Sequence, residues 1–309
     1  MQTLKKSILK VVAYFDLFNY PVTYDEIKFF LDRPVKENAL LADIQDLADA
    51  AMLYRMNGYY ALKPDYSMVE RRITGNRAAE KKLKFAARIA RFLSRFPYIR
   101  GVAISGSLSK NFAYKGSDID FFIITAPNRL WVARMIFLCF FYIAKLVGLR
   151  NWFCLNYFID TASLEIPEKN IYTAIEIATL MPRQGSAAYK DFYAHNAWVY
   201  NYLPNYLPAY EDAADHKKGL VKTTVEWLLN NKAGDRLDNF LCRFYRNRWK
   251  KMLDKKTFAK NGFQFGSYIA GRHVCKPMPH YFQARVLTRL DEKMNELESK
   301  LIVPQQIAV

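Results

Sequence analysis

Residues 1–62 carry apolar side chains in the patterns of three helices and a hairpin. Apolar residues recur at helical spacing in residues 4–18, and Thr23 and Glu26 have the spacing of a capping box that would begin a second helix. Leucine, isoleucine and methionine side chains recur at intervals of three and four in residues 37–52, which predicts a third helix. Asn57-Gly58 lies between apolar and aromatic runs and predicts a β-hairpin.

The middle of the chain has the pattern of two strands joined by a polar segment. The apolar residues 102–104 run into Gly106-Ser107, and a second apolar run begins at Asp118 and Asp120. Two carboxylates two positions apart lie on one face of a strand, where their charges repel. Mg²⁺ between them would offset this repulsion and keep positions open for phosphate oxygens. A turn with Asp120 solvated at a strand edge is the alternative.

A wholly apolar run, residues 135–144, is bracketed by Arg134 and Lys145. Its ten residues are too few for a membrane span, which needs about 20. The run therefore predicts a helix buried against the sheet, and no membrane partner is expected. Residues 151–160 form the pattern of the next strand. Strict alternation there would place the following side chains on one face: Trp152, Cys154, Asn156, Phe158 and Asp160.

The strand, small-residue turn and Asp-x-Asp strand together resemble the nucleotidyltransferase superfamily typified by DNA polymerase β. The family signature is an apolar residue, Gly, Gly or Ser, a spacer, and then Asp, apolar, Asp or Glu, apolar. Here Gly106 and Ser107 are followed by ten intervening residues and by Asp118-Ile119-Asp120-Phe121. Small bacterial members carry a basic residue and a Gly after the turn. Lys110 and Asn111 occupy those places, and Asn tolerates the left-handed conformation.

The resemblance implies a palm-like α/β core and transfer of a nucleoside monophosphate to a hydroxyl acceptor, with release of pyrophosphate. Asp118 and Asp120 would bind Mg²⁺ or Mn²⁺, and these ions would bridge the phosphates of a nucleoside triphosphate. The residues that would contact the nucleotide are Gly106, Ser107, Lys110 and Ser117. The acceptor is left open among a small molecule, a protein and an RNA.

The family also implies a third carboxylate on the strand that follows, where this chain departs from the pattern. Asn156 lies near the centre of that strand, and Asn cannot take a proton as a carboxylate can. Asp160 is four residues further along, or roughly 13 Å. Catalysis through Asp160 is slightly favoured, and Glu176 on the next helix is a weaker candidate. A catalytically degenerate regulatory or protein-binding module is the alternative function.

The patterns together predict an α+β multidomain protein. The expected units are a winged helix (1–66), a basic linker helix (67–97), a nucleotidyltransferase core (98–185) and a helical C-terminal region (186–309).

Apolar residues make up 51% of the chain and aromatic residues 16%, which excludes a disordered protein. The four cysteines lack C-x-x-C spacing, and no secretion signal begins the chain. Reduced thiols and a cytoplasmic location are therefore expected.

The charge distribution argues against duplex DNA binding by the winged helix. Residues 1–62 contain seven Lys or Arg and eight Asp or Glu, whereas the whole chain carries a net charge of +17. Phosphate neutralisation supplies most non-specific DNA affinity, so a DNA-binding transcription factor is disfavoured. Basic residues concentrate in segments 71–95 and 243–256. Each is either a solvated helical face or a surface for triphosphate or RNA.

Overall fold

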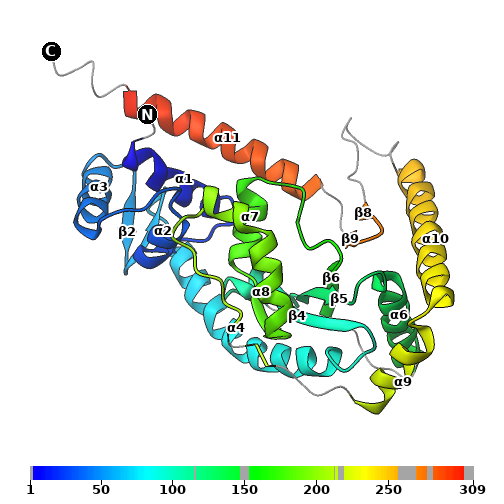
Figure 1. The fold of residues 1–309 in the computed structure, drawn as a ribbon. Helices are drawn as coiled ribbons and strands as arrows, with labels where there is room; N and C mark the ends of the chain where they lie inside the picture. Colours follow the sequence, from blue (N-terminus) through cyan, green and yellow to red (C-terminus); the bar gives the residue numbers. More distant parts are fainter. Residues whose placement is uncertain are drawn as a thin grey trace.

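The computed structural model shows a mixed α and β protein built around one six-stranded sheet (Figure 1). The structure describes residues 3–114, 116–146, 153–211, 213–214, 219–256, 269–276 and 281–302. Within this part of the chain, no helix is long and apolar enough to cross a membrane.

The N-terminal unit consists of three helices and a small three-stranded sheet. Its elements are α1 (Leu4–Asp16), β1 (Val22–Thr23), α2 (Tyr24–Phe30), α3 (Glu37–Asp49), β2 (Tyr54–Met56) and β3 (Tyr59–Ala61), with strand order β1-β3-β2. The predicted capping box is present, because Thr23 and Glu26 each accept a backbone hydrogen bond from the other. Asn57 and Gly58 have φ of 51° and 82°, the positive values that a tight hairpin turn requires.

A long helix, α4 (Tyr66–Leu93), leads from this unit to the central sheet. The strands of this sheet are β4 (Ile99–Ser105), β5 (Ile119–Thr125), β6 (Phe153–Asp160), β7 (Met181–Gln184), β8 (Ile269–Ala270) and β9 (Val274–Lys276), in the order β7-β4-β5-β6-β9-β8. β5 and β6 are parallel, whereas the other neighbours are antiparallel. A parallel pair requires a crossover, and α6 (Leu130–Leu146) supplies it. The apolar run 135–144 is therefore part of a helix, as predicted, but it is not wholly buried against the sheet, because Phe140, Tyr142 and Ile143 are exposed.

The two faces of the sheet are covered by different helices. Ile119, Phe121 and Ile123 face a cluster shared with α4, α6 and α10 (Lys232–Lys256). Phe122 and Ile124 face the opposite side, toward α7 (Ile171–Ala178) and α8 (Ser186–His195). This alternation buries most of β5 on both faces. Only the start of the strand, near Asp120, is available for a polar site.

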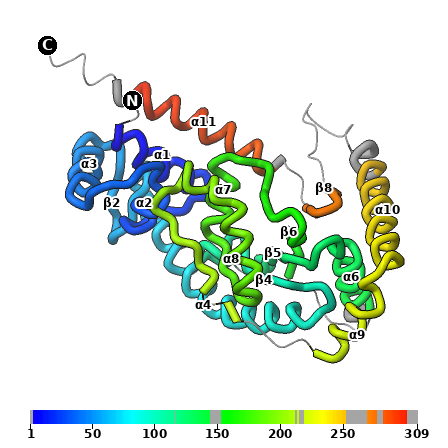
Figure 2. Tube along the Cα trace, in the orientation of Figure 1, coloured from blue at the N-terminus to red at the C-terminus, as the bar shows by residue number. Residues whose placement is uncertain are grey.

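The C-terminal region is mostly helical, but it also completes the sheet. After the 3-10 helix Ala197–Asn201 come α9 (Leu220–Leu229), α10, β8, β9 and α11 (Tyr281–Ile302). The predicted helical C-terminal region is present, and in addition its short strand β9 pairs with β6 of the central sheet. α11 lies along α1 (Figure 2), where Lys293 pairs with Asp16 and Lys6 pairs with Glu298 at 2.6 Å.

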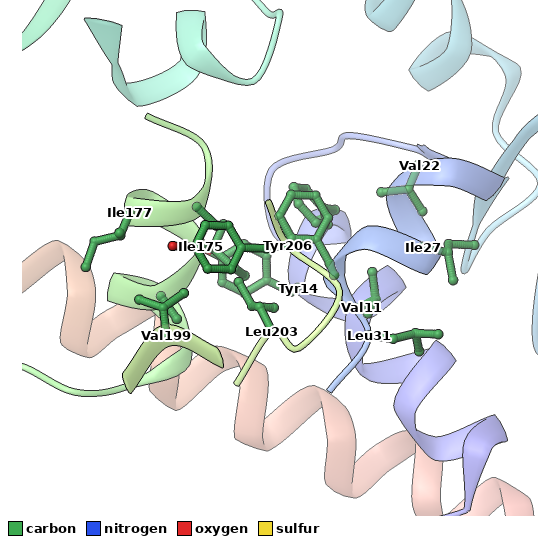
Figure 3. Close-up of a cluster of buried hydrophobic side chains, with 14 of the residues drawn as sticks. Val11, Tyr14, Val22, Ile27, Leu31, Ile175, Ile177, Val199, Leu203 and Tyr206 are labelled. Atoms are coloured by element: carbon green, nitrogen blue, oxygen red, sulfur yellow. The ribbon is translucent and has the colours of Figure 1, made fainter. Parts of the chain in front are cut away.

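One apolar cluster connects the N-terminal unit with the helices that cover the sheet. Figure 3 shows Val11 and Tyr14 of α1 in the same cluster as Ile175 of α7, Leu203 and Tyr206. All five side chains are almost completely buried. Burial of this kind stabilises the folded chain by about 25 cal/mol per Å² of apolar surface, so the N-terminal unit is held firmly against the sheet layer.

Candidate functional site

The turn after β4 and the Asp-x-Asp segment before β5 lie side by side. In the β4–β5 register Ser105 is opposite Asp120, and the short helix α5 (Gly106–Ser109) begins directly after β4. Gly106 has a φ of +70°, and a Cβ built there would lie 2.4 Å from the Asp120 Oδ2 atom. Only glycine accepts both this conformation and this close approach. The fold thus presses the Asp120 carboxylate against the glycine turn.

The carboxylates of this segment differ in their surroundings. Asp118 is exposed, whereas Asp120 is half-buried. Burial raises the pKa of Asp120 to about 6, with further contributions from the Glu176 and Asp118 carboxylates that Lys110 and Lys82 partly oppose. Burial and two neighbouring carboxylates therefore disfavour the ionised form of Asp120. A divalent cation beside this carboxylate would favour the ionised form.

Lys110 connects the glycine turn to α7. Its Nζ atom lies 2.8 Å from Glu176 Oε1 and donates a second hydrogen bond, of 3.2 Å, to the carbonyl oxygen of Gly106. The structure therefore brings Glu176 into the site. After burial, Glu176 has the largest effect on the Asp120 pKa. Sequence reasoning ranked Glu176 as the weaker candidate because a contact between a helix and a distant loop leaves no local pattern.

Asn111, Ser107 and Ser117 shape the loop between the two strands. Asn111 has a φ of +53°, the left-handed conformation for which Asn was expected to replace Gly. Ser107 is exposed, and its carbonyl oxygen accepts hydrogen bonds from the backbone N–H groups of Lys110 and Phe112, both at 3.1 Å. Ser117 Oγ donates to the Tyr114 carbonyl oxygen at 3.0 Å.

Lys82 is a member of the site that sequence reasoning did not single out. Its Nζ atom donates to Ser117 Oγ at 2.9 Å and also to the Ser117 carbonyl oxygen. It also opposes the raised pKa of Asp120. Lys82 lies in the basic segment 71–95, whose lysines and arginines follow helical spacing. That spacing was the only available signal, and it does not show which cation faces the loop.

A β-bulge in β6 overturns the expected alternation on this strand. Cys154 is opposite Asp120 and Leu155 opposite Phe121, but Phe122 is opposite Tyr157, so Asn156 is the extra residue. Cys154 and Tyr157 consequently share the face of Asp120. Phe158 packs on the opposite face in the α6 cluster. The expectation that Cys154, Asn156, Phe158 and Asp160 share one face is wrong, and Trp152 lies outside the described residues.

The structure does not bring Asp160 to the site. Asp160 is opposite Thr125 at the far end of β5, six positions from Cys154, or roughly 20 Å along the strand. Its carboxylate is fully buried and accepts hydrogen bonds from the backbone N–H groups of Asn128 and Ala162, each at 3.0 Å. His273 Nδ1 lies 3.0 Å from the same carboxylate. These contacts join three loops, one of them the turn between β8 and β9, so the position of Asp160 contradicts the expectation that it reaches Asp118 and Asp120.

The oxygen donors present suit a hard divalent cation, although the protein supplies few of them. The described residues contain no group of three or more His, Cys, Asp or Glu side chains arranged to hold a metal ion. Mg²⁺ and Mn²⁺ in phosphate chemistry are bound by one or two carboxylates, with water and substrate phosphates completing the coordination. Asp118 and Asp120 fit such an incomplete site.

Comparison with known proteins identifies this part of the chain. Residues 86–171 match the model of the family described as nucleotidyltransferase domain. The match begins in α4 and contains Gly106, Lys110, Asp118 and Asp120. No curated protein and no solved structure matches the chain. The segment that holds the glycine turn and the paired carboxylates is therefore a nucleotidyltransferase domain, consistent with the DNA polymerase β-like superfamily.

Proposed function

We propose that this protein is a Mg²⁺- or Mn²⁺-dependent nucleotidyltransferase that moves a nucleoside monophosphate from a nucleoside triphosphate to a hydroxyl acceptor. The observation that carries the proposal is the contact between Gly106 and Asp120. This contact brings the two halves of the family signature together, and a side chain at position 106 would collide with the Asp120 carboxylate. A chance match of the sequence signature would not explain this contact.

Each charged residue near the turn has a role in this proposal. Asp118 and Asp120 would hold a divalent ion, which would supply positive charge at the phosphates. Lys110 and Lys82 both act electrostatically on Asp120 and supply fixed positive charge for the triphosphate. Ser107 offers an exposed hydroxyl for a phosphate oxygen. Ser117, which directly precedes Asp118, is held by a hydrogen bond from Lys82.

Glu176 is our candidate for the general base. The acceptor oxygen forms a bond to the α-phosphorus, its proton passes to the Glu176 carboxylate, and the bond to the bridging oxygen breaks to release pyrophosphate. The support is positional, since Glu176 interacts with Asp120 and lines the cavity beside it. Asp160 is not among the residues that shift the Asp120 pKa, and it does not line this cavity. A carboxylate from a helix would thus replace the one that the family carries on a strand.

A catalytically degenerate regulatory or protein-binding module is the second candidate function. It is favoured by one observation, namely that β6 presents Cys154 and the bulged Asn156 to the site where a carboxylate was expected. Such a module would still bind nucleotide through the glycine turn. It would not release pyrophosphate.

The N-terminal unit, residues 1–66, is proposed to be a winged helix that makes protein contacts. The element order α1-β1-α2-α3-β2-β3 and the pairing of all three strands support this assignment. The further units proposed are the linker helix 67–97, the core 98–185 and the C-terminal region 186–309. Contacts of α1 with α11 indicate that the N-terminal unit packs against the rest of the chain.

The test of the proposed function is Mg²⁺-dependent release of pyrophosphate from labelled nucleoside triphosphates, with cell extract as the source of acceptor. Asp118→Asn and Asp120→Asn should each lower turnover at least about 100-fold, because the metal site loses a charged ligand. Asp191→Asn removes an exposed carboxylate of α8 outside the site and should have no effect. Wild-type turnover in either site variant would contradict the metal assignment.

A further inference from the structure

A cavity lies between the sheet and α7, and its lining includes Ser105, the β4 residue opposite Asp120. Its volume is about 90 Å³, and residues of β4, β5, β6, α7 and β9 line it. Its polar lining includes Ser105, Asn156, Tyr157, Tyr172, Glu176 and Lys276. Ser105 is opposite Asp120 in the β4–β5 register, and the Glu176 and Asp120 carboxylates, after burial, both contribute to the raised pKa of Tyr172. The cavity is therefore in electrostatic reach of the candidate metal site.

Two hydroxyl groups in this lining have no hydrogen-bond partner among the described residues. These are Ser105 Oγ and the Tyr157 hydroxyl, and both atoms are buried. A buried hydroxyl without a partner costs about 1–3 kcal/mol. Tyr157 is held rigidly nonetheless, because its ring stacks on Phe122 with centroids 4.9 Å apart and an interplanar angle of 10°. Hydroxyls held in fixed positions without partners indicate a ligand that can both donate and accept hydrogen bonds.

The walls of the cavity restrict the ligand to a small one. Phe122, Ile166, Ile177 and Leu180 form its apolar side, and all four are buried in the core. A polymer cannot pass through this layer without unpacking it. The volume exceeds that of a single water site, which needs about 10–15 Å³, and suits one compact ring.

The charges of the lining point to an uncharged ligand. The Glu176 carboxylate is paired with Lys110 at 2.8 Å. Lys276 lines the same cavity as Glu168 and Glu176, and their charges oppose the lowering of its pKa by burial. Positive and negative groups thus offset each other around the cavity. A charged ligand would therefore be repelled by the carboxylates or by the ammonium groups around the cavity, whichever carry the same sign as the ligand.

We propose that this cavity is the acceptor subsite and that the acceptor is a small uncharged polyol of the size of one sugar or cyclitol ring. This inference rests on the proposed nucleotidyl transfer. The reacting hydroxyl would lie between Ser105 Oγ and the Glu176 carboxylate, next to Asp120. Its oxygen bonds to the α-phosphorus, its proton passes to Glu176, and pyrophosphate leaves. The hydroxyls of Ser105 and Tyr157 hydrogen-bond other oxygens of the ring.

The experiment supplies wild-type protein with Mg²⁺, a labelled nucleoside triphosphate and one test acceptor at a time. The uncharged test acceptors are D-glucose, myo-inositol and glycerol, and D-glucosamine and D-glucuronate are the charged counterparts. Mass spectrometry identifies the ester of the nucleoside monophosphate. A ring-sized uncharged acceptor should give more ester than either charged compound. Preference for a charged compound, or transfer only to protein or RNA in an extract, would overturn the inference.

Two tyrosine variants link the result to the cavity. Tyr157→Phe should raise the acceptor concentration needed for half-maximal transfer about tenfold, the effect of one lost hydrogen bond. The dissociation constant of the triphosphate should stay the same. Tyr193→Phe is the matched control, because the Tyr193 hydroxyl is also buried without a partner but lies outside the cavity. Equal acceptor dependence of Tyr157→Phe and wild type would overturn the inference.

The nucleotide measurements separate the two proposals. If wild-type protein binds the triphosphate and releases pyrophosphate to water but modifies no polyol, the acceptor assignment is wrong and the proposed function stands. If wild-type protein binds no triphosphate in the presence of Mg²⁺, the proposed function is wrong, and the acceptor assignment falls with it.

Discussion

The hydroxyl of Tyr20 donates a hydrogen bond of 2.7 Å to the carbonyl oxygen of Lys110, across 90 residues of sequence. The Tyr20 ring also meets Phe112 edge-on, with centroids 5.9 Å apart, and the Arg72 guanidinium lies 3.8 Å from the ring centroid. Arg72 in turn binds both carboxylate oxygens of Glu26, at 2.8 and 2.9 Å. The N-terminal unit therefore holds the loop that carries a candidate triphosphate-binding lysine.

Tyr20→Phe should weaken triphosphate binding while the fold remains intact. The variant keeps the ring contacts but loses the hydrogen bond to Lys110 and the 3.2 Å contact with Glu26 Oε1. Loss of the Lys110 bond, worth about 1 kcal/mol, should raise the dissociation constant about fivefold. Titration with a non-hydrolysable triphosphate and a thermal unfolding scan measure the two effects. Tyr66→Phe, at an exposed tyrosine that begins α4, is the control. An unchanged dissociation constant would show that the bond is purely structural.

Glu176→Gln and Asp160→Asn should affect different properties. Loss of a general base lowers turnover by about 100-fold or more, so Glu176→Gln should retain nucleotide binding and lose transfer. Asp160→Asn places an amide N–H₂ among the N–H donors of Asn128 and Ala162. It should destabilise the protein by about 1–3 kcal/mol with unchanged turnover per folded molecule. Chemical denaturation and single-turnover transfer distinguish the two variants. Loss of transfer in Asp160→Asn, with normal transfer in Glu176→Gln, would show that Asp160 and not Glu176 takes part in the reaction.

Asp238 should give the protein a pH-dependent stability. Its carboxylate accepts the backbone N–H groups of Trp131 and Val132 at 2.8 and 2.9 Å, and burial raises its pKa from 3.8 to about 6. A carboxyl with a raised folded pKa binds its proton more tightly in the folded state, so its contribution to stability falls as pH rises from about 4 to about 6.

Asp238→Asn should therefore be more stable than wild type at pH 7.5, by up to about 2 kcal/mol. Asn can accept the same two hydrogen bonds without the cost of a buried charge. Urea denaturation at pH 7.5 and at pH 4.5 measures the difference, which should shrink at the lower pH. A variant less stable than wild type at pH 7.5 would show that the charge itself stabilises the start of α6.

Nucleic-acid binding by the full chain should depend on α10 and not on the N-terminal unit. The net charge of +17 predicts non-specific binding at low salt that falls steeply as salt is added. Arg243→Glu with Arg248→Glu, at exposed positions of α10, should weaken binding to a duplex. The matched pair Lys28→Glu with Lys36→Glu, in the N-terminal unit, should have little effect. Fluorescence anisotropy measures both, and the reverse result would favour DNA recognition by residues 1–66.

The sequence by itself determined the local features of this protein. The Thr23–Glu26 capping box, the Asn57-Gly58 hairpin and the left-handed Asn111 were all predicted and are present. Each depends on the backbone preference of one residue or on contacts within one turn of chain. The Gly106-Ser107 turn and the Asp118-x-Asp120 segment were predictable for the same reason, because their residue types and spacing follow the signature of the family whose model matches residues 86–171.

Only the tertiary structure decided which third carboxylate joins that site. The Asn156 bulge reverses the faces of β6 at a residue that carries no Gly or Pro signal, since register is set by packing against β5. Glu176 reaches the site from α7, and Asp160 is held at the far end by His273 of a distant loop. These contacts join residues separated by 66 and 113 positions. Periodicity reports which face of an element is apolar, whereas the partner of that face depends on how all elements pack together.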